Sequence, residues 1–376
     1  IAQCLVGSEM CIRDRYIHIP FCQGKCPYCD FYSVNFSSQM ADQYTAHMCR
    51  QIAKKAKEDN HKVVQTLYLG GGTPSVLGTN RLLEIIFSAR RHFFMQRPEI
   101  TVEVNPTSAR QLDFSALHHA GVNRVSLGVQ SANARELAVL GRKHTVQDAK
   151  QTAQKACRAG IANLSMDLML GVPGQTRETL QASIDFCIAN GARHISCYIL
   201  KIEKGTPYFY QKEQLGLPNE DEQAELYLFM CMYLEQMGFT QYEISNFSKP
   251  DMESRHNLNY WRCGEYLGLG PSAHSFLNGR RFYTPQSFSA FYENISIDDG
   301  PGGGEEEYIM LALRLKEGLV FQAFEQKYKK PFPFRYIQNA RKYTKENLLT
   351  CDQKGIRLSQ KGFLLSNSLI AGVLWG

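Results

Sequence analysis

Three cysteines lie close together near the start of the sequence, at Cys22, Cys26 and Cys29. Their spacing is CxxxCxxC, so one loop can present three thiolates to a common centre. Three thiolates can hold a [4Fe–4S] cluster and leave one iron without a protein ligand. An iron that is open in this way can bind a substrate or a cofactor, whereas a site closed by a fourth cysteine mainly transfers electrons. The spacing therefore predicts a reactive iron–sulfur centre.

Other interpretations of these cysteines are a zinc site, a disulfide or unrelated thiols. Structural zinc usually draws on paired CxxC units or on histidines at defined spacing, and no matching pair follows here. The seven solitary cysteines elsewhere, beyond residue 15, suit reduced core thiols, which argues against an oxidising compartment and a disulfide. The cluster is therefore the favoured interpretation.

Glycine and polar residues follow several predicted strands. The turn GGGTP at residues 70–74 follows the second strand, where it could let a ligand approach the backbone closely, although a tight loop explains it equally well. Taken singly, each polar residue is as easily a capping or loop residue as a ligand. Together they would converge on one mouth of a barrel, which is where barrel sites are built. They are Glu103, Gln130, Arg142 and Asp167.

The segment 16–31 and the glycine turn together resemble the radical S-adenosylmethionine superfamily. The resemblance implies that S-adenosylmethionine chelates the open iron through its amino and carboxylate groups. It also implies that the reduced cluster cleaves the sulfonium to a 5′-deoxyadenosyl radical. The cofactor-binding residues expected on this basis are Tyr16, Tyr28, Gly71, Gly72, Thr73, Glu103, Gln130, Arg142 and Asp167.

The resemblance also implies a role for most of these residues. Tyr28 occupies the position whose ring flanks the adenine, and residues 71–73 match the motif that meets the methionine amino group. Arg142 can pair with the methionine carboxylate through its planar fork of donors. Glu103 is expected to take the ribose hydroxyls, with the remaining polar side chains completing the ring.

Two further features separate subgroups of this superfamily. Phe31 stands two residues after the third cysteine, and residues 256–261 read HNLNYW, followed by YLGLGPSAHS at 266–275. The blocks together resemble the coproporphyrinogen-dehydrogenase branch over nearly the whole chain from Tyr16. Oxygen-independent dehydrogenases carry a fourth cysteine at the position of Phe31, whereas the HemW-type haem chaperones carry HNxxYW. The sequence therefore resembles the HemW-type haem chaperones.

His256 opens this motif and is a candidate haem ligand. Imidazole is a good axial ligand, and the rings of Tyr260 and Trp261 could stack on a porphyrin. Alternatively, His256 is a hydrogen-bonded structural histidine and the two rings pack the barrel against the C-terminal region. Both interpretations stay open at this point. His18 is expected to be structural because it lies within the first strand, and His274 is undecided.

The resemblance predicts a haem chaperone that transfers haem to respiratory acceptor proteins, with a [4Fe–4S] cluster on three cysteines and exchangeable S-adenosylmethionine. One alternative is an oxygen-independent coproporphyrinogen III dehydrogenase, which decarboxylates its substrate oxidatively. Another is a radical enzyme acting on some other tetrapyrrole. Phe31 and the intact HNxxYW motif favour the chaperone, and no residue is assigned a catalytic role.

The elements that must position these residues alternate between strand and helix. Six such units imply an α/β fold with a parallel sheet and right-handed crossovers. A partial (β/α)6 radical-SAM barrel is favoured over an open dinucleotide fold, because no GxGxxG opens a helix after the first strand. The predicted strands are 16–20, 66–69, 99–104, 124–128, 163–170 and 194–200, and the helices are 40–57, 80–94, 113–119, 146–159, 177–190 and 220–237.

The chain then divides around this barrel, which is assigned to residues 16–240. Residues 1–15 contain a stretch that reads as a translated sequencing adapter, so this segment is treated as non-native and its two cysteines, Cys4 and Cys11, are left out of the chemistry. Residues 241–300 form a connecting region that carries HNxxYW.

A small domain is predicted at residues 301–376, similar to the C-terminal domain of HemN-type proteins. A loop over 298–304, DDGPGGG, leads into it. The domain is expected to be mostly helical and winged-helix-like, with a wing near 349–358.

The composition of the chain indicates which other classes of partner are expected. A net charge of +6 over 376 residues comes without a dense Lys/Arg run, so nucleic acid is not expected. No stretch approaches the roughly 18–20 apolar residues of a membrane helix, and no secretory signal is evident. A cytoplasmic protein is predicted, with haem and haem-accepting respiratory proteins as partners. Peripheral membrane association and a homodimer are further expectations.

Overall fold

Six parallel strands form the centre of one large sheet. The computed structural model describes residues 14–58 and 62–376. The six strands lie side by side in chain order, which confirms the predicted parallel α/β sheet. They are β1 (Asp14–Ile19), β4 (Val63–Gly71), β5 (Phe94–Val104), β6 (Arg124–Gln130), β7 (Asn163–Leu170) and β8 (His194–Ile199).

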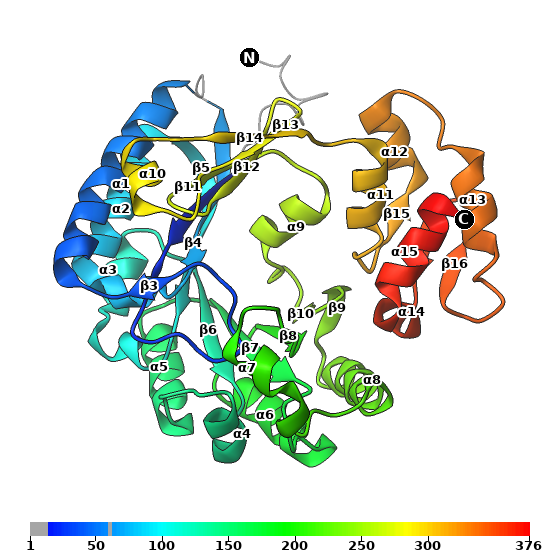
Figure 1. Cartoon of the computed structure of the whole chain (residues 1–376), viewed down its shortest axis with the longest axis horizontal. Coiled ribbons are helices and arrows are strands. Elements are labelled where there is room, and N and C mark those ends of the chain that lie inside the picture. The colour runs from blue at the N-terminus through cyan, green and yellow to red at the C-terminus, as the bar shows by residue number, and fades with distance from the viewer. Residues whose placement is uncertain (1–13, 59–61) are drawn as a thin grey trace.

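The helices between these strands cover the outer, convex face of the curved sheet (Figure 1). The first of them buries Ala41, Tyr44, Met48 and Ile52, which recur every three or four residues along one side. A short helix, α4, was not anticipated from the sequence. The helices between the strands are α1 (Ser38–Glu58), α2 (Gly78–His92), α3 (Phe114–His119), α4 (Ala134–Val139), α5 (Val146–Arg158) and α6 (Arg177–Ala189); α7 (Pro207–Gln211) and α8 (Glu220–Gln236) follow β8.

Short elements connect these units. A small parallel pair, β2 and β3, closes the loop that carries the three cysteines. Single 3-10 turns precede α2 and α3 and follow α7. These elements are β2 (Phe21–Cys22), β3 (Val34–Asn35), η2 (Pro74–Leu77), η3 (Ser108–Gln111) and η4 (Lys212–Gln214).

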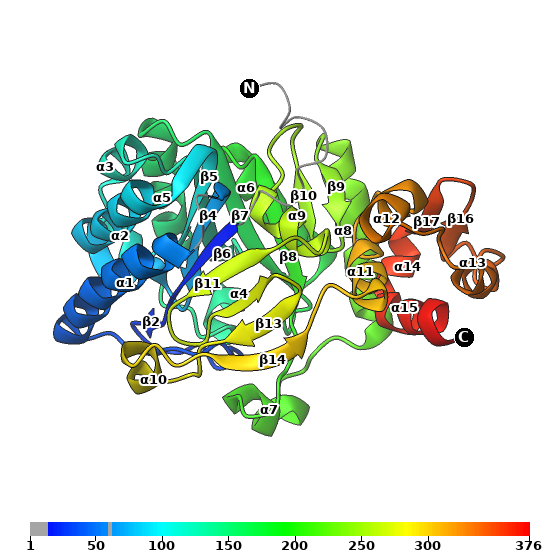
Figure 2. The same ribbon diagram turned by 90° about the horizontal axis from the view of Figure 1, so that it is seen from above.

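The region from residue 240 to 301 extends the same sheet at both edges, which the sequence did not predict. β11 pairs in parallel with β1 and continues antiparallel through β12, β13 and β14, while β10 and β9 join β8 at the other edge. Figure 2 shows these extension strands side by side, with β14 leading toward the C-terminal helices. The predicted loop over 298–304 therefore begins as a strand. The bounds are β9 (Thr240–Glu243), β10 (Asn246–Ser248), β11 (Tyr266–Leu269), β12 (His274–Leu277), β13 (Arg280–Tyr283), β14 (Ile297–Pro301) and α10 (Phe288–Tyr292).

The HNxxYW motif forms a separate helix, α9 (Arg255–Trp261), inside the arc of the sheet. Figure 1 shows α9 in the space enclosed by the strands, between β4 and the C-terminal helices. The Ser254 hydroxyl begins this helix by accepting a hydrogen bond from the Asn257 N–H. The motif therefore lies against the inner face of the barrel.

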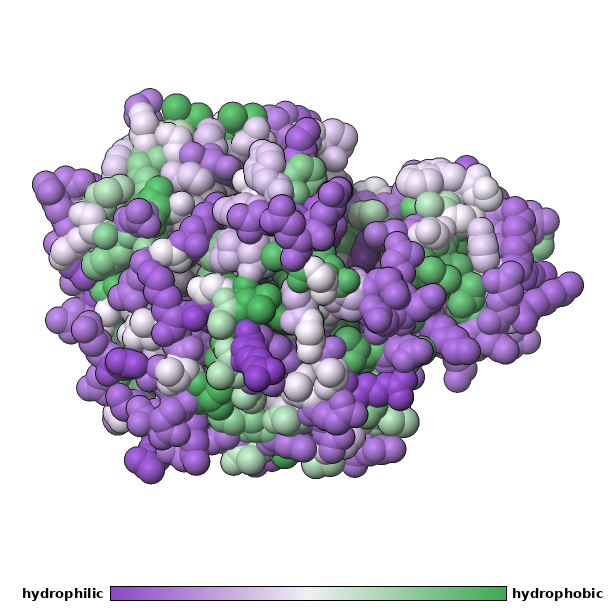
Figure 3. Space-filling view, turned by 60° about the horizontal axis from the view of Figure 1, so that its bottom comes forward, coloured by the Kyte–Doolittle hydropathy of each residue, from purple (hydrophilic) through white to green (hydrophobic). Residues whose placement is uncertain are grey.

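The C-terminal region is a small, mostly helical module, as predicted. Five helices surround a three-stranded antiparallel sheet, and Figure 3 shows the module as a smaller lobe beside the main body. Its elements are α11 (Glu305–Ala312), β15 (Leu319–Val320), α12 (Phe321–Tyr328), α13 (Phe334–Arg341), β16 (Leu349–Cys351), β17 (Gly355–Leu358), α14 (Gln360–Leu364) and α15 (Ser366–Trp375). None of the helices in the described part of the chain is both long and apolar enough to span a bilayer.

The segment assigned to a sequencing adapter overlaps the described residues at its end. Residues 1–13, with Cys4 and Cys11, lie outside them. Asp14 and Arg15 are the first residues of β1 and are buried, and the Asp14 carboxylate accepts the backbone N–H of Thr66 at 3.0 Å. The strand thus begins two residues before the boundary drawn from the sequence.

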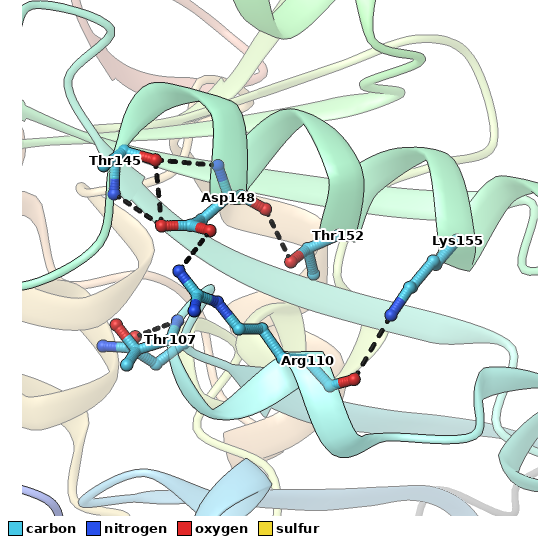
Figure 4. A network of polar contacts seen from close by, with 7 residues as sticks. Thr107, Arg110, Thr145, Asp148, Thr152 and Lys155 are labelled. Carbon is cyan, nitrogen blue, oxygen red and sulfur yellow. Dashed lines mark hydrogen bonds and ion pairs between the residues drawn. The ribbon is translucent and has the colours of Figure 1, made fainter.

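A polar network fixes the start of α5 (Figure 4). Thr145 and Asp148 form a capping box, in which each side chain accepts the backbone N–H of the other. Arg110 pairs with the Asp148 carboxylate at 2.6 Å, and Lys155 donates to the carbonyl of Arg110 at 3.2 Å. Because Arg142 lies three residues before the cap, this network fixes one end of the loop that carries it.

Candidate functional site

The three cysteines lie on a loop that is held at its base. The pairing of β2 with β3 places Cys22 opposite Asn35, so the residues between them form a closed loop at the carboxyl end of β1. Within the loop, the Cys29 N–H donates to the Cys26 carbonyl at 3.1 Å. Backbone bonds thus set the path of the loop, and none of its three thiols is tied up in a disulfide.

The thiols supply the right donor chemistry for a [4Fe–4S] cluster, but they do not form a ready-made cage. All three are free and partly buried. Over residues 14–58 and 62–376, no three His, Cys, Asp or Glu side chains converge closely enough to hold a metal ion. Metal binding commonly orders its own ligands, so cluster insertion would draw this loop together. The three thiols on one loop fit a cluster with one open iron.

The glycine turn after β4 packs against the end of β1. The Gly72 N–H donates to the Ile19 carbonyl at 2.9 Å. Gly71 has φ +113°, and a Cβ at that position would lie 2.7 Å from the His18 ring. Thr73 connects the turn to the cysteine loop, because its hydroxyl lies 3.4 Å from the Cys22 sulfur. Glycine is therefore needed here for close approach between two strands, and the turn borders the cysteine loop.

Glu103 on β5 faces the same turn. Its carboxylate accepts the Tyr68 hydroxyl at 2.8 Å and the Gly71 N–H at 3.1 Å. Burial, helped by the nearby Asp167 carboxylate, raises the pKa of Glu103 to about 7, even though these two hydrogen bonds lower it. The position of Glu103 beside the glycine turn suits the ribose-binding role expected of it.

Arg142 and Tyr28 contact one another at the edge of the cysteine loop. The guanidinium donates to the Tyr28 hydroxyl at 2.6 Å and lies 5.7 Å from the centre of that ring. Arg142 Nε is buried and has no hydrogen-bond partner among the described residues. A buried donor without an acceptor is costly, so this nitrogen is available for an anionic group of a ligand.

Asp167 and Gln130 lie deeper in the barrel. Both carboxylate oxygens of Asp167 accept the Ser126 hydroxyl, at 3.0 and 3.1 Å, and burial raises the pKa of Asp167 above its usual value. Gln130 ends β6 with φ +67° and is buried. Asp167 is near enough to Glu103 and Arg142 to act on their charges. Gln130 makes no hydrogen bond to the other predicted residues in the described structure.

Polar side chains line the interior of the barrel along the strands, well beyond the strand ends. Polar side chains occupy every second strand position, which places them on one face. The alternation is present in the sequence, but site residues were predicted only near the strand ends. Tyr68 and Ser126 were therefore not predicted. The inward-facing pairs are Thr66/Tyr68, Thr101/Glu103, Arg124/Ser126, Ser165/Asp167 and His194/Ser196.

The segment around α7, which was not predicted to belong to the site, contacts the cysteine loop. The Tyr208 N–H, at the start of α7, donates to the Pro27 carbonyl at 3.1 Å. The Tyr208 ring lies 6.4 Å from the ring of Tyr28. No local pattern in residues 201–219 predicts the contact between α7 and the cysteine loop, because it joins segments far apart in the chain.

Tyr16 and His256 lie away from the cysteines. The Tyr16 hydroxyl bonds His18 Nδ1 at 3.1 Å, and its ring lies 6.4 Å from the His256 ring. His256 Nδ1 is 2.5 Å from the hydroxyl of Thr66. Thr66 precedes Gly71 by five residues on β4, which is roughly 17 Å along a strand. The structure therefore joins His256 to the amino end of the barrel.

Both ring nitrogens of His256 have protein partners. Nε2 is 2.8 Å from the Tyr260 hydroxyl, and the His256 backbone N–H donates to Glu99 at 3.2 Å. The ring stacks on Tyr68 with centroids 5.0 Å apart, and burial lowers the pKa of His256 to about 3. This is the environment of a neutral, hydrogen-bonded structural histidine, one of the two interpretations left open by the sequence.

Two family profiles match the chain. The Radical SAM superfamily matches residues 16–187, and the HemN C-terminal domain matches residues 306–365. A solved structure of the coproporphyrinogen III oxidase HemN from Escherichia coli superposes with a TM-score of 0.81, at 22% identity, over 96% of this chain and 89% of that one. At this identity the likeness concerns the fold.

Curated relatives extend over nearly the full length. The heme chaperone HemW of Bacillus subtilis is 32% identical, over 96% of this chain and 99% of the relative. HemW of Synechocystis sp. is 35% identical, over 84% and 81%, respectively. A mitochondrial radical S-adenosyl methionine domain-containing protein 1 from Bos taurus is 32% identical, over 96% and 86%. The chain therefore belongs to the radical SAM superfamily and, within it, to the HemW-type haem-chaperone family.

Proposed function

We propose that this protein is a haem chaperone, which binds haem and passes it to respiratory acceptor proteins. The observation that carries the proposal is the similarity, over almost the full length of both chains, to relatives named heme chaperones. The HNLNYW helix inside the barrel and the C-terminal module belong to the matched region. The chaperone role thus rests on the whole chain rather than on one motif.

The proposed cofactors are a [4Fe–4S] cluster on Cys22, Cys26 and Cys29 and an exchangeable S-adenosylmethionine. When bound, they supply one-electron chemistry and a source of radicals. Two features of the chain support S-adenosylmethionine at the cluster. Arg142 Nε is a buried donor awaiting an anion, and the Glu103 carboxylate lies beside the glycine turn.

The remaining proposed positions complete the S-adenosylmethionine site. Tyr28 is held by Arg142 and Tyr208 at the edge of the loop, where its ring can flank an adenine. Gln130 and Asp167 line the interior beyond. Tyr16 is proposed to bound the site from β1, since its ring lies 6.2 Å from that of Tyr68.

A coproporphyrinogen dehydrogenase is the competing function. Phe31 occupies the position at which the dehydrogenases carry a further cysteine, and 64% of its surface is exposed. A phenyl ring can neither ligate iron nor donate a hydrogen bond. Phe31 therefore favours the chaperone over the dehydrogenase.

One experiment separates the two functions. The reconstituted protein is incubated without oxygen with S-adenosylmethionine, a reductant and coproporphyrinogen III, and in parallel is titrated with haemin. The chaperone proposal expects a Soret band that saturates at a fixed stoichiometry and no protoporphyrinogen IX. Formation of protoporphyrinogen IX, or no haem binding, would contradict the proposal.

Delivery to respiratory acceptors implies further properties, which we also propose. The protein works in the cytoplasm, approaches a membrane surface when it meets its acceptor, and forms a homodimer. Light scattering of the cluster-loaded protein tests the dimer, and flotation with vesicles of anionic and neutral lipids tests the surface association. A monomer at all concentrations, or no flotation in the presence of haem, would remove the corresponding property.

A further inference from the structure

A cavity of about 330 Å³ lies between the cysteine loop and the strands that extend the sheet beyond β1. Asp30, Phe31 and Tyr32, which directly follow Cys29, line one side, and Tyr266 and His274 on β11 and β12 line another. Figure 2 shows β2, at the base of the loop, beside these extension strands. Five of the ten lining side chains are Tyr or Phe, so the cavity offers flat, apolar surfaces.

Two histidines line this cavity, and only one has free ring nitrogens. His18 is buried, with Nδ1 bonded to the Tyr16 hydroxyl and Nε2 to the Tyr32 carbonyl, both at 3.1 Å. His274 is exposed, and its ring makes no hydrogen bond to any residue in the described ranges. Its ring is stacked on Tyr283 of the neighbouring strand, with centroids 5.0 Å apart and planes at 21°. The imidazole of His274 is thus held in place while its nitrogens remain available.

His256 differs from His274 on each of these points. It is buried, and Thr66 and Tyr260 occupy both of its ring nitrogens. Tyr260 also lines the cavity and so stands between it and His256. A ligand entering from the cavity would have to displace Tyr260 and break a buried hydrogen bond before it reached this imidazole. It would meet His274 directly.

We propose that haem is seated in this cavity, with the imidazole of His274 as an axial ligand of the iron. The inference rests on the proposed haem-chaperone function and names the ligand and the place. Neutral imidazole is a common haem ligand, and the aromatic walls can stack against the porphyrin. The volume is at the lower end for a small-molecule pocket, roughly 300–1,000 Å³, so part of the ring faces solvent. A partly exposed haem site of this kind suits a protein that must release its haem to an acceptor.

The position also links the cargo to the cluster. The Phe31 ring is largely exposed at the cavity, two residues after Cys29. Because residues 30–32 serve as wall and as the continuation of the cysteine loop, closure of the loop around a cluster would move one wall of the haem seat. Haem affinity should therefore differ between the cluster-loaded and the cluster-free protein.

The test is a haemin titration of the full chain, read by absorption and by the reduction potential of bound haem. His274→Ala should shift the Soret band and weaken binding at least tenfold. His274→Met should retain haem and raise its midpoint potential, because methionine ligation raises the potential relative to histidine. A change that was only structural would not produce this ligand-specific shift.

Two further variants make the test decisive. His119→Ala removes an exposed histidine on α3 and should bind haem as the wild type does. His256→Gln should keep the wild-type Soret position and midpoint potential. If His274→Ala and His274→Met both match the wild type, the ligand assignment is wrong while the chaperone function stands. If the wild type binds no haemin, both are wrong.

Discussion

The two ends of the barrel use similar side chains in opposite ways. At the carboxyl end, three thiols are free of disulfides and the buried Arg142 Nε has no hydrogen-bond partner in the described structure. At the amino end, His256 gives one ring nitrogen to Thr66 and the other to Tyr260. A polar group whose partners are already supplied by the protein stabilises the fold, whereas a buried group without partners awaits a ligand.

The difference also separates two histidines: His256, which the sequence offered as a candidate haem ligand, and His274, which it left undecided. His256 belongs to a conspicuous motif, yet its surroundings resemble those of a core residue. His274 lies in a less conspicuous stretch, yet its ring is exposed at an aromatic cavity. The comparison therefore predicts that loss of His256 lowers stability, while loss of a cluster cysteine or of His274 removes cofactor or cargo and leaves the fold intact.

The largest effect is expected from Cys26→Ala. With two thiolates left on the loop, the cluster should not assemble, so iron content and the brown colour should fall to background after anaerobic reconstitution. The far-ultraviolet circular dichroism should stay unchanged, because the Cys26 side chain forms no structural hydrogen bond among residues 14–58 and 62–376. The matched control is Cys157→Ala, a free and exposed thiol on α5. Unchanged iron content in Cys26→Ala would refute the assignment.

His256→Ala is expected to have the next largest effect. It removes two side-chain hydrogen bonds and a ring stacked on Tyr68, and it leaves a cavity beside Tyr260. The free energy of unfolding should fall by about 2–5 kcal/mol, measured by denaturant titration. His274→Ala, at an exposed position, should change it by less than about 0.5 kcal/mol. Equal losses of unfolding free energy in the two variants would contradict a structural role that is specific to His256.

The sequence predicted the parallel core well because each of its strands carries apolar residues at alternate positions and is followed by a helix. It missed β9 to β14 because they are four or five residues long at most and depend on pairing with distant strands. The clearest case is β11, which lies beside β1 although some 250 residues separate them in the chain, at a register pairing Tyr16 with Gly268. A window along the chain cannot detect such pairing.

The candidate site was predictable where local spacing carried the information. The motifs CxxxCxxC and GGGTP both predict loops. The structure brings these two loops together, with Thr73 beside Cys22. The partners of these residues were harder to foresee, since Tyr68 and Tyr208 reach the site only through tertiary contacts. The sequence did not show whether His256 is a haem ligand or a structural residue, because that depends on the hydrogen bonds of its ring.

Opposite responses to pH should distinguish the two ends. Burial lowers the pKa of His256 to about 3, so the stability that neutral His256 provides is complete above pH 6.5 and is lost as pH falls toward 3. Burial raises the pKa of Glu103 to about 7, so its contribution is complete below pH 4.5 and is lost as pH rises through 7. Subtracting the free energy of unfolding of His256→Gln or Glu103→Gln from that of the wild type isolates each response.

The expected change for His256 is about 2–3 kcal/mol between pH 7 and pH 4.5. A smaller change is expected for Glu103, which is only partly buried. Denaturant titrations at four pH values between 4.5 and 7.5 measure both. Differences that stay flat with pH, or that slope in the same direction, would contradict the assigned environments.

The smallest effect is expected at the glycine turn and tests whether close approach or backbone conformation requires glycine there. Gly71 (φ +113°) and Gly78 (φ +77°) both have positive φ, but a Cβ would lie 2.7 Å from the His18 ring at Gly71 and would meet nothing within 4 Å at Gly78. Both alanine variants incur backbone strain, and Gly71→Ala should also displace His18. We therefore expect Gly71→Ala to lower the free energy of unfolding by about 1–2 kcal/mol more than Gly78→Ala. Equal losses would mean that the turn needs glycine for its backbone angles alone.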